Sequence, residues 1–230
     1  MLRSVDLLTS RIIAAPHAFT SRIGGVSTAP FDSLNTSFAV GDDAAHVHDN
    51  LERISRAFGM SAEQVVTLEQ IHGDQIVHLP SDRHNAPAGG SAQKGDALLT
   101  DAADVLVGVR TADCIPLLIE GPGSEFVAAV HAGWRGVMNE IAVKTVFALD
   151  RLGQKSIDLR MAVGPCIRSC CYEIDPVLAD QFVAAFGNEV IRSTVGAKPR
   201  LDLVHALLVS LDRVGVDRSQ IDVVDVCTSC

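Results

Sequence analysis

GDALLTDAADVLVGVRTADCIPLLIEGPGSEFVAAVH, residues 95–131, is the stretch that decides the fold of this chain. It holds four apolar runs of strand length, and Gly, Pro or Asp punctuates each of them. The runs cover residues 96–100, 105–110, 114–119 and 126–131. Runs this short are typical of a buried sheet rather than of helices. Because hairpin-length gaps join them, a mixed sheet is a better interpretation than a doubly wound parallel one.

Strands and helices alternate in the second half of the chain. Apolar residues at helical spacing and the stop signal Gly153 predict one helix over 136–152. Further helices are predicted from the N-cap Asp175 to about residue 186 and over 201–214. Strands are predicted at 65–68, 159–163 and 221–226, and an exposed loop at 81–95. The predicted fold class is mixed α/β (α+β), with mixed β-sheets covered by helices.

The amino-acid composition and net charge limit the classes of function that this chain can have. The 230 residues are 47% hydrophobic, 20% charged and 4% aromatic, which is typical of one globular domain, 1–230, with an aliphatic core. A net charge of -9 argues against nucleic acid and anionic membranes as partners. The sequence has neither a signal-peptide pattern nor a long apolar span, and its cysteines do not read as a disulfide framework. The expected location is the cytoplasm, with reduced thiols.

Three reactive side chains stand where predicted strands end. They are His72 in EQIHGD (69–74), Cys114 in RTADCIPLLI (110–119) and His131 in VAAVHAGWRG (127–136). Two imidazoles and a thiolate are good zinc ligands, and three protein ligands leave a fourth position open, as in catalytic zinc sites. Bound zinc lowers the pKa of water to about 7 and so supplies hydroxide at neutral pH.

The residues alone leave other interpretations open. Cys114 could be a metal-free nucleophile with one histidine as its base. It could also be an inert buried thiol, with His131 a core histidine, and spacing alone favours this structural interpretation. A separate four-thiolate zinc site could form among the remaining cysteines, although a C-x2-C at the frayed end of the sequence weighs against it. Those cysteines are Cys166, Cys170, Cys171, Cys227 and Cys230.

The motifs taken together resemble a known family. SRIGGVSTAPFDSLN (21–35), KGDALLTD (94–101) and GPCIRSCCYEID (164–175) join the three segments above. In this order they are similar to the laccase-domain family, which is named for multicopper polyphenol oxidases. Its members are also described as purine nucleoside phosphorylases, adenosine deaminases and, in one bacterial branch, peptidoglycan editing factors. The resemblance covers nearly the whole chain and implies a YfiH-like architecture, similar to that of cysteine hydrolases.

The resemblance also implies roles for particular residues. His72, Cys114 and His131 match the family's catalytic and metal-binding His, Cys and His, with zinc as the expected cofactor and copper as the alternative. Arg22 and Asn35 match a segment near the substrate pocket. A phosphate cradle could be formed by Arg22 with its neighbouring glycines, or by Arg135. Family members carry an aromatic, arginine-rich segment after Cys-Thr, and the sequence here ends at Cys230, so no arginine of that segment is assigned.

These observations predict an enzyme acting on purine nucleosides. The leading expectation is a purine nucleoside phosphorylase that uses phosphate to cleave adenosine, inosine and related nucleosides. Zinc-dependent adenosine deamination is a second activity expected at the same site. The alternatives are a cysteine hydrolase editing peptidoglycan precursors, a copper-dependent polyphenol oxidase, and a metal-binding interaction module without catalysis. The sequence gives no oligomeric state.

Overall fold

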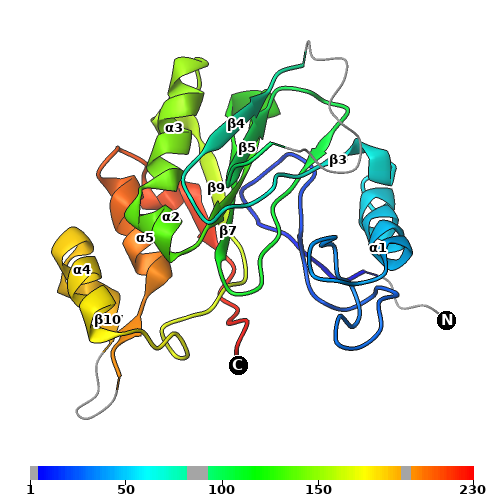
Figure 1. The fold of residues 1–230 in the computed structure, drawn as a ribbon. Coiled ribbons are helices and arrows are strands. Elements are labelled where there is room, and N and C mark those ends of the chain that lie inside the picture. Colours follow the sequence, from blue (N-terminus) through cyan, green and yellow to red (C-terminus); the bar gives the residue numbers. More distant parts are fainter. Residues whose placement is uncertain (1–4, 82–92, 193–197) are drawn as a thin grey trace.

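The computed structural model describes residues 5–81, 93–192 and 198–230 and is built around one six-stranded sheet (Figure 1). The sheet order is β12-β9-β7-β8-β5-β4. Its strands are β4 (Ile76–Leu79), β5 (Ala97–Thr100), β7 (Ile115–Glu120), β8 (Val127–Ala132), β9 (Arg160–Val163) and β12 (Ile221–Val223). The pairs β4–β5 and β9–β12 are parallel and the other three are antiparallel. The expected mixed α/β fold with a mixed sheet is confirmed.

Three small two-stranded pairs lie outside this sheet. They are β1 (Leu7–Leu8) with β2 (Phe19–Thr20), β3 (Val65–Val66) with β6 (Leu106–Val107), and β10 (Ile191–Arg192) with β11 (Arg200–Leu201). The apolar run 105–110 therefore contributes only two strand residues, and these pair with β3 rather than extending the large sheet. Most of the loop predicted at 81–95 falls outside the described residues.

Helices cover one face of the large sheet, on the left in Figure 1. They are α2 (Trp134–Met138), α3 (Ile141–Arg151), α4 (Pro176–Phe186) and α5 (Leu203–Asp212). Short 3-10 helices occur at Ala62–Gln64, Pro122–Ser124, Ser156–Asp158, Asn188–Val190 and Arg218–Gln220. The main core forms between these helices and alternate strand residues such as Leu117 and Ile119. The intervening Leu118 belongs to the opposite face, where it packs with Ile13 and Phe19 of the N-terminal segment, as the two-residue period of a strand requires.

The helix predicted over 136–152 is divided into two helices, so the prediction of one continuous helix was wrong. Helix α2 ends at Met138, and Glu140, with φ of 59°, adopts the left-handed region that interrupts a right-handed helix. Helix α3 then begins at Ile141. The break redirects the chain immediately after the segment that carries His131, and both helices still contribute to the main core.

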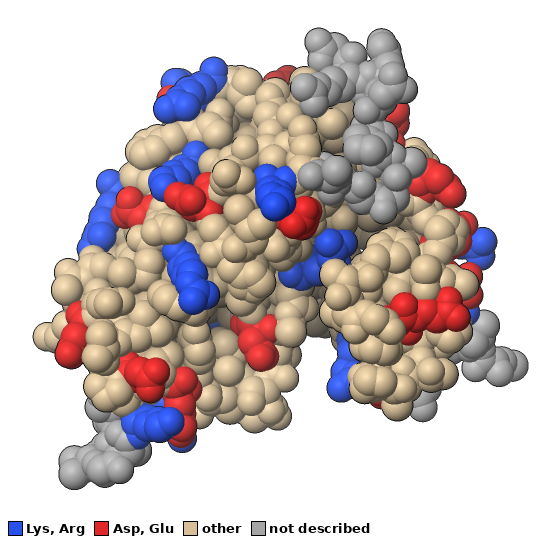
Figure 2. Space-filling view, viewed as in Figure 1, with Lys and Arg blue, Asp and Glu red and all other residues tan. Residues whose placement is uncertain are grey.

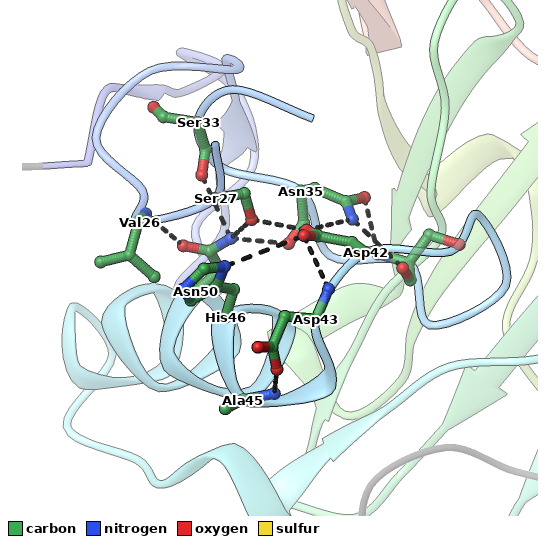
Figure 3. Close-up of polar contacts among 10 residues, drawn as sticks. Val26, Ser27, Ser33, Asn35, Asp42, Asp43, Ala45, His46 and Asn50 are labelled. Carbon is green, nitrogen blue, oxygen red and sulfur yellow. Dashed lines mark hydrogen bonds and ion pairs between the residues drawn. The ribbon is translucent and has the colours of Figure 1, made fainter. Parts of the chain in front are cut away.

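Helix α1 (Ala44–Arg56), which was not predicted from the sequence, anchors the N-terminal loop. The Asn50 side chain is fully buried and sits at the centre of the hydrogen-bonded cluster in Figure 3. Its Oδ1 accepts from the Val26 backbone N–H at 2.8 Å, and its Nδ2 lies 2.8 Å from the Asn35 carbonyl oxygen and 2.9 Å from Ser27 Oγ. One side chain thus satisfies several buried groups of a loop that has no regular structure of its own.

Replacing Asn50 by alanine is expected to lower the free energy of unfolding by about 3 kcal/mol, because several groups of the N-terminal loop lose a hydrogen-bond partner at once. Urea unfolding followed by circular dichroism measures this. Asp43→Ala on the same helix removes the N-cap bond to the Ala45 N–H and is expected to cost only about 1 kcal/mol. Equal effects of the two variants would contradict the central role given to Asn50.

The surface has no single-sign charge on the face seen in Figure 2, where acidic and basic side chains are interspersed. That face is hollowed between the part containing α2 to α5 and the part containing α1. Among the residues that the structure describes, none of the helices has the length and apolar character needed to cross a bilayer.

Candidate functional site

Strand register brings two of the three predicted ligands, Cys114 and His131, to the same end of the sheet. Strand β8 pairs with β7 so that Ala132 lies opposite Ile115, and the next step places Gly133 beside Cys114. On its other side β8 pairs with β5, Val130 opposite Ala97, which places His131 beside Asp96. The His131 backbone N–H donates to the Asp96 carbonyl oxygen at 2.7 Å and continues this ladder. Residues far apart in sequence are therefore neighbours because of hydrogen bonding in the sheet.

The side chains of His72, Cys114 and His131 converge. One ligand atom from each lies within 4.8 Å of the others, and the two imidazole rings meet edge to face with their centroids 4.8 Å apart. His131 is buried, Cys114 is half-buried and His72 is exposed. The cluster is therefore buried in the core at His131 and exposed to solvent at His72. We call these three residues the His-Cys-His cluster.

Asp96 stands directly behind this cluster and was not singled out from the sequence. Its fully buried carboxylate accepts a hydrogen bond from His131 Nδ1 at 2.8 Å, which leaves Nε2 of the ring available. The same carboxylate accepts backbone N–H bonds from His72 at 3.0 Å and Gly73 at 2.7 Å. It therefore orients one histidine and fixes the loop of the other, which holds His72 at a positive φ of 56°.

A metal ion fits the chemistry of this donor set. Two imidazoles and a thiolate suit zinc, and a carboxylate on the second nitrogen of a ligand histidine is the usual outer partner in metal sites. Gly133 keeps the space beside the thiol clear, because a Cβ at that position would lie 3.0 Å from Cys114 Sγ. The four residues and the glycine together have the features of a three-ligand metal site.

Burial sets the protonation of the cluster. It raises the pKa of the Cys114 thiol, and the negative charges of Asp113 and Asp96 raise it further. Burial also lowers the pKa of His131, although the hydrogen bond and charge of Asp96 oppose that shift. In the absence of a cation the thiol is therefore protonated at neutral pH and the imidazole neutral. This disfavours a free thiolate nucleophile, whereas a bound cation would stabilise the thiolate.

Metal-free protein is expected to lose stability as the pH falls below 6.5, the ordinary pKa of histidine, because the unfolded chain then takes up a proton that buried His131 resists. This contribution is fully present above pH 6.5 and is lost as the pH falls through the lowered folded-state pKa. Urea midpoints at pH 7.5 and 5.5, measured with chelator, should differ more for the unmodified chain than for His131→Gln. Equal differences between the two pH values would contradict this assignment, because the remaining titratable groups are the same in both proteins.

Two further residues lie near the cluster. The pKa of half-buried Tyr172 is raised by burial and then by the charges of Cys114 and Asp113, while the charge of Arg135 lowers it. Arg135 is the second residue of α2, which begins directly after Gly133, and Gly133 lies beside the Cys114 thiol. Its guanidinium carbon stacks 4.2 Å from the centroid of the Trp134 ring. Arg135 thus places a positive charge close to the cluster in the chain, and Tyr172 is an addition to the residues singled out from the sequence.

The predicted substrate residues Arg22 and Asn35 make their hydrogen bonds elsewhere. The Arg22 guanidinium donates to the Asp32 carbonyl oxygen and carboxylate, at 2.6 and 3.0 Å for Nη2. Asn35 Nδ2 donates to Asp42 Oδ2 at 2.9 Å within the cluster around Asn50 (Figure 3). These bonds lie within the N-terminal loop and its helix. The structure does not join either side chain to the His-Cys-His cluster by a hydrogen bond.

Known proteins resemble this chain over most of its length. A purine nucleoside phosphorylase from Deinococcus radiodurans is 39% identical over 212 residues, covering 92% of this chain and 80% of that protein. The purine nucleoside phosphorylase YlmD from Geobacillus stearothermophilus is 37% identical over 218 residues, covering 92% and 80%.

Solved structures agree. The crystal structure of Geobacillus stearothermophilus YlmD matches with a TM-score of 0.88 at 34% identity, covering 100% of this chain and 88% of that one. A Bacillus licheniformis hypothetical protein, YfiH, matches with a TM-score of 0.85 at 30% identity, covering 93% and 82%. The model of the family described as multi-copper polyphenol oxidoreductase laccase matches residues 16–230. The match spans the N-terminal loop, the sheet and the His-Cys-His cluster alike, and the chain belongs to this family.

Proposed function

We propose that this protein is a purine nucleoside phosphorylase that acts at the His-Cys-His cluster on adenosine, inosine and related nucleosides. The observation that carries the proposal is the convergence of His72, Cys114 and His131 before the buried carboxylate of Asp96. Relatives that share 37–39% of the sequence carry the name purine nucleoside phosphorylase. The reaction needs nucleoside and phosphate together, so both are proposed substrates.

In phosphorolysis a phosphate oxygen bonds to C1′ of the ribose while the C1′–N9 bond breaks. The electron pair of that bond passes to the purine, which leaves after protonation, and ribose 1-phosphate is the other product. Positive charge develops on the ribose and negative charge on the base, so donors and cations that are already in place lower the barrier. Arg135 is the proposed phosphate ligand, because it follows closely after Gly133, which lies beside the Cys114 thiol. Arg22 and Asn35 remain proposed substrate-segment residues.

The cluster itself is proposed to hold a zinc ion through His72, Cys114 and His131. Zinc bound there would supply a Lewis acid beside the reacting groups. Asp96 keeps the Nδ1 proton of His131 in place, so that Nε2 can act as the ligand atom. Two histidines and one cysteine also suit copper, the alternative metal. Metal analysis of the protein as purified, together with its visible absorption, distinguishes a zinc protein from a copper protein with polyphenol oxidase chemistry.

The activity test separates phosphorolysis from deamination by product. Purified full chain is incubated with adenosine, with and without phosphate, and the products are separated by liquid chromatography. Phosphorolysis gives adenine and ribose 1-phosphate only when phosphate is present. Deamination, the proposed second activity, gives inosine and ammonia with or without phosphate, because water replaces the 6-amino group.

Two histidine variants make the test specific to the cluster. His72→Ala removes a proposed ligand and should abolish product formation, whereas His48→Ala changes an exposed histidine of α1 and should leave the rate unchanged. Adenosine and inosine that survive unchanged with metal-replete protein would overturn the proposal. Peptidoglycan precursors would then be the next substrates tested, although the raised pKa of Cys114 argues against a cysteine hydrolase.

A further inference from the structure

A second group of sulfur atoms lies outside the His-Cys-His cluster. Four cysteines, Cys170, Cys171, Cys227 and Cys230, each place a sulfur within 4.8 Å of the other three. The Sγ atoms of Cys170 and Cys230 are 3.6 Å apart. Four thiolates on a tetrahedral zinc ion, with Zn–S of about 2.3 Å, have sulfurs about 3.8 Å apart. The spacing of these sulfurs is therefore close to the spacing that a zinc ion would impose.

The backbone brings the two pairs of cysteines together. Cys166 forms an isolated parallel bridge with Cys227, in which the Cys166 N–H donates to the Val226 carbonyl oxygen and the Thr228 N–H to the Cys166 carbonyl oxygen. A turn closed by the Cys171 N–H on the Arg168 carbonyl oxygen at 2.9 Å then returns the adjacent cysteines toward the C-terminal segment. Cys166 itself is buried in the main core and is not one of the four.

The four cysteines form two close pairs along the chain. Cys170 and Cys171 are adjacent, and Cys227 and Cys230 have the C-x2-C spacing that is common in zinc-binding turns. Cys170 and Cys230 are exposed and Cys171 and Cys227 are half-buried, so the group lies at the surface, where an ion can reach it.

We propose that Cys170, Cys171, Cys227 and Cys230 form a structural zinc site, separate from the His-Cys-His cluster. Four protein ligands would leave no position for substrate, which is the arrangement of structural rather than catalytic zinc. The thiols release their protons and the ion takes their place, so no oxidant or reductant is required. The soft, tetrahedral all-sulfur donor set selects zinc over magnesium or calcium.

The site would fasten the C-terminal segment next to the catalytic turn. Thr228 Oγ1 donates to Asp113 Oδ1 at 2.6 Å, and the Ile167 N–H donates to the Asp113 carbonyl oxygen at 2.9 Å. Asp113 precedes Cys114 in the chain. Both segments that carry the four thiols thus hold the residue beside the proposed catalytic cysteine, so zinc at the four thiols would also stabilise the position of Cys114.

The test uses full-length chain with His72 and Cys114 both replaced by alanine, so that metal at the His-Cys-His cluster cannot contribute. The protein is purified with reductant, stripped with chelator and titrated with Co²⁺ and then Zn²⁺. One equivalent of Co²⁺ should bind with intense visible d–d bands and thiolate-to-cobalt charge transfer in the near ultraviolet, and Zn²⁺ should displace it. Zinc should also raise the thermal midpoint of this variant.

Two variants made in the same background decide the assignment. Cys230→Ser changes an exposed residue, so the fold should survive while the cobalt spectrum weakens and zinc affinity falls at least tenfold. Ser229→Ala, between the two cysteines of the turn, is the matched control and should bind as the parent does. Failure of the parent to bind Co²⁺, a spectrum unchanged by Cys230→Ser, or a Cys170–Cys230 disulfide that persists under reductant would each overturn the proposal, whatever the nucleoside assay gives.

Discussion

Replacing Cys114 by alanine is expected to reduce the proposed phosphorolysis at least about 100-fold and to abolish the proposed metal binding at the His-Cys-His cluster. Loss of an outer-shell partner of a metal ligand already costs about 10- to 100-fold in affinity or activity, and Cys114 is proposed as a direct ligand. The thiol is half-buried and stands before β7 rather than within it, so the folded state should persist. The effect should therefore appear in turnover and in metal content, and much less in stability.

The measurement compares metal content, the rate of adenine release and the urea midpoint in one preparation. A variant with unchanged far-ultraviolet circular dichroism, little metal at the cluster and little activity would support Cys114 as a ligand. A variant that keeps its metal and loses its activity would instead support a nucleophilic cysteine. Full activity in Cys114→Ala would contradict both roles, and His48→Ala serves again as the unaffected reference.

The local pattern of apolar residues and turn residues was sufficient to predict much of the fold. The runs 96–100, 114–119 and 126–131 are strands because apolar residues of strand length are bounded by residues that end strands. Helix α4 begins at Pro176 after Asp175, as predicted. Helix α1 was missed although its signals are local: Asp43 caps it, and Val47 and Leu51 repeat at helical spacing on its buried side.

Other features depend on contacts that no local pattern encodes. The run 105–110 pairs with β3 and not with the large sheet. The composition of the run predicts a strand but does not determine which strand it will pair with. The predicted continuous helix is broken at Glu140, a residue type without a strong preference for positive φ. The cluster of four cysteines depends on the bridge between Cys166 and Cys227, which joins two segments that lie 61 positions apart in the sequence.

In the candidate site too, some residues could be predicted from the sequence and one depends on tertiary contacts. The types and order of His72, Cys114 and His131 were sufficient to predict the cluster once the family resemblance was added, and the structure brings all three together. Asp96 could not be identified in this way, because its role follows from the register of β5 on β8. The available signal was an aspartate immediately before the largely apolar run ALLT, in the KGDALLTD segment, where a buried carboxylate requires several partners.

Replacing Asp96 is the second substitution for which we expect a large effect on both metal affinity and stability. Asp96→Ala is expected to weaken metal binding at the cluster about 10- to 100-fold, because the His131 ring loses the partner that fixes its orientation. It should also lower the free energy of unfolding by about 3 kcal/mol or more, since three partly buried backbone N–H groups of the 71–73 loop and the buried His131 ring lose their acceptor. Zinc competition with a chromophoric chelator and urea unfolding measure the two effects separately.

The matched control lies at the other end of the same strand. Asp101 follows β5 as Asp96 precedes it, and its carboxylate accepts from Ser81 N–H and Oγ, both at 2.8 Å, without touching the cluster. Asp101→Ala should therefore cost some stability and leave zinc affinity unchanged. If Asp96→Ala loses stability but binds zinc as tightly as the unmodified chain, Asp96 supports only the loop. If affinity falls in Asp96→Ala alone, the carboxylate acts through the orientation of His131, and the buried acid belongs to the metal site.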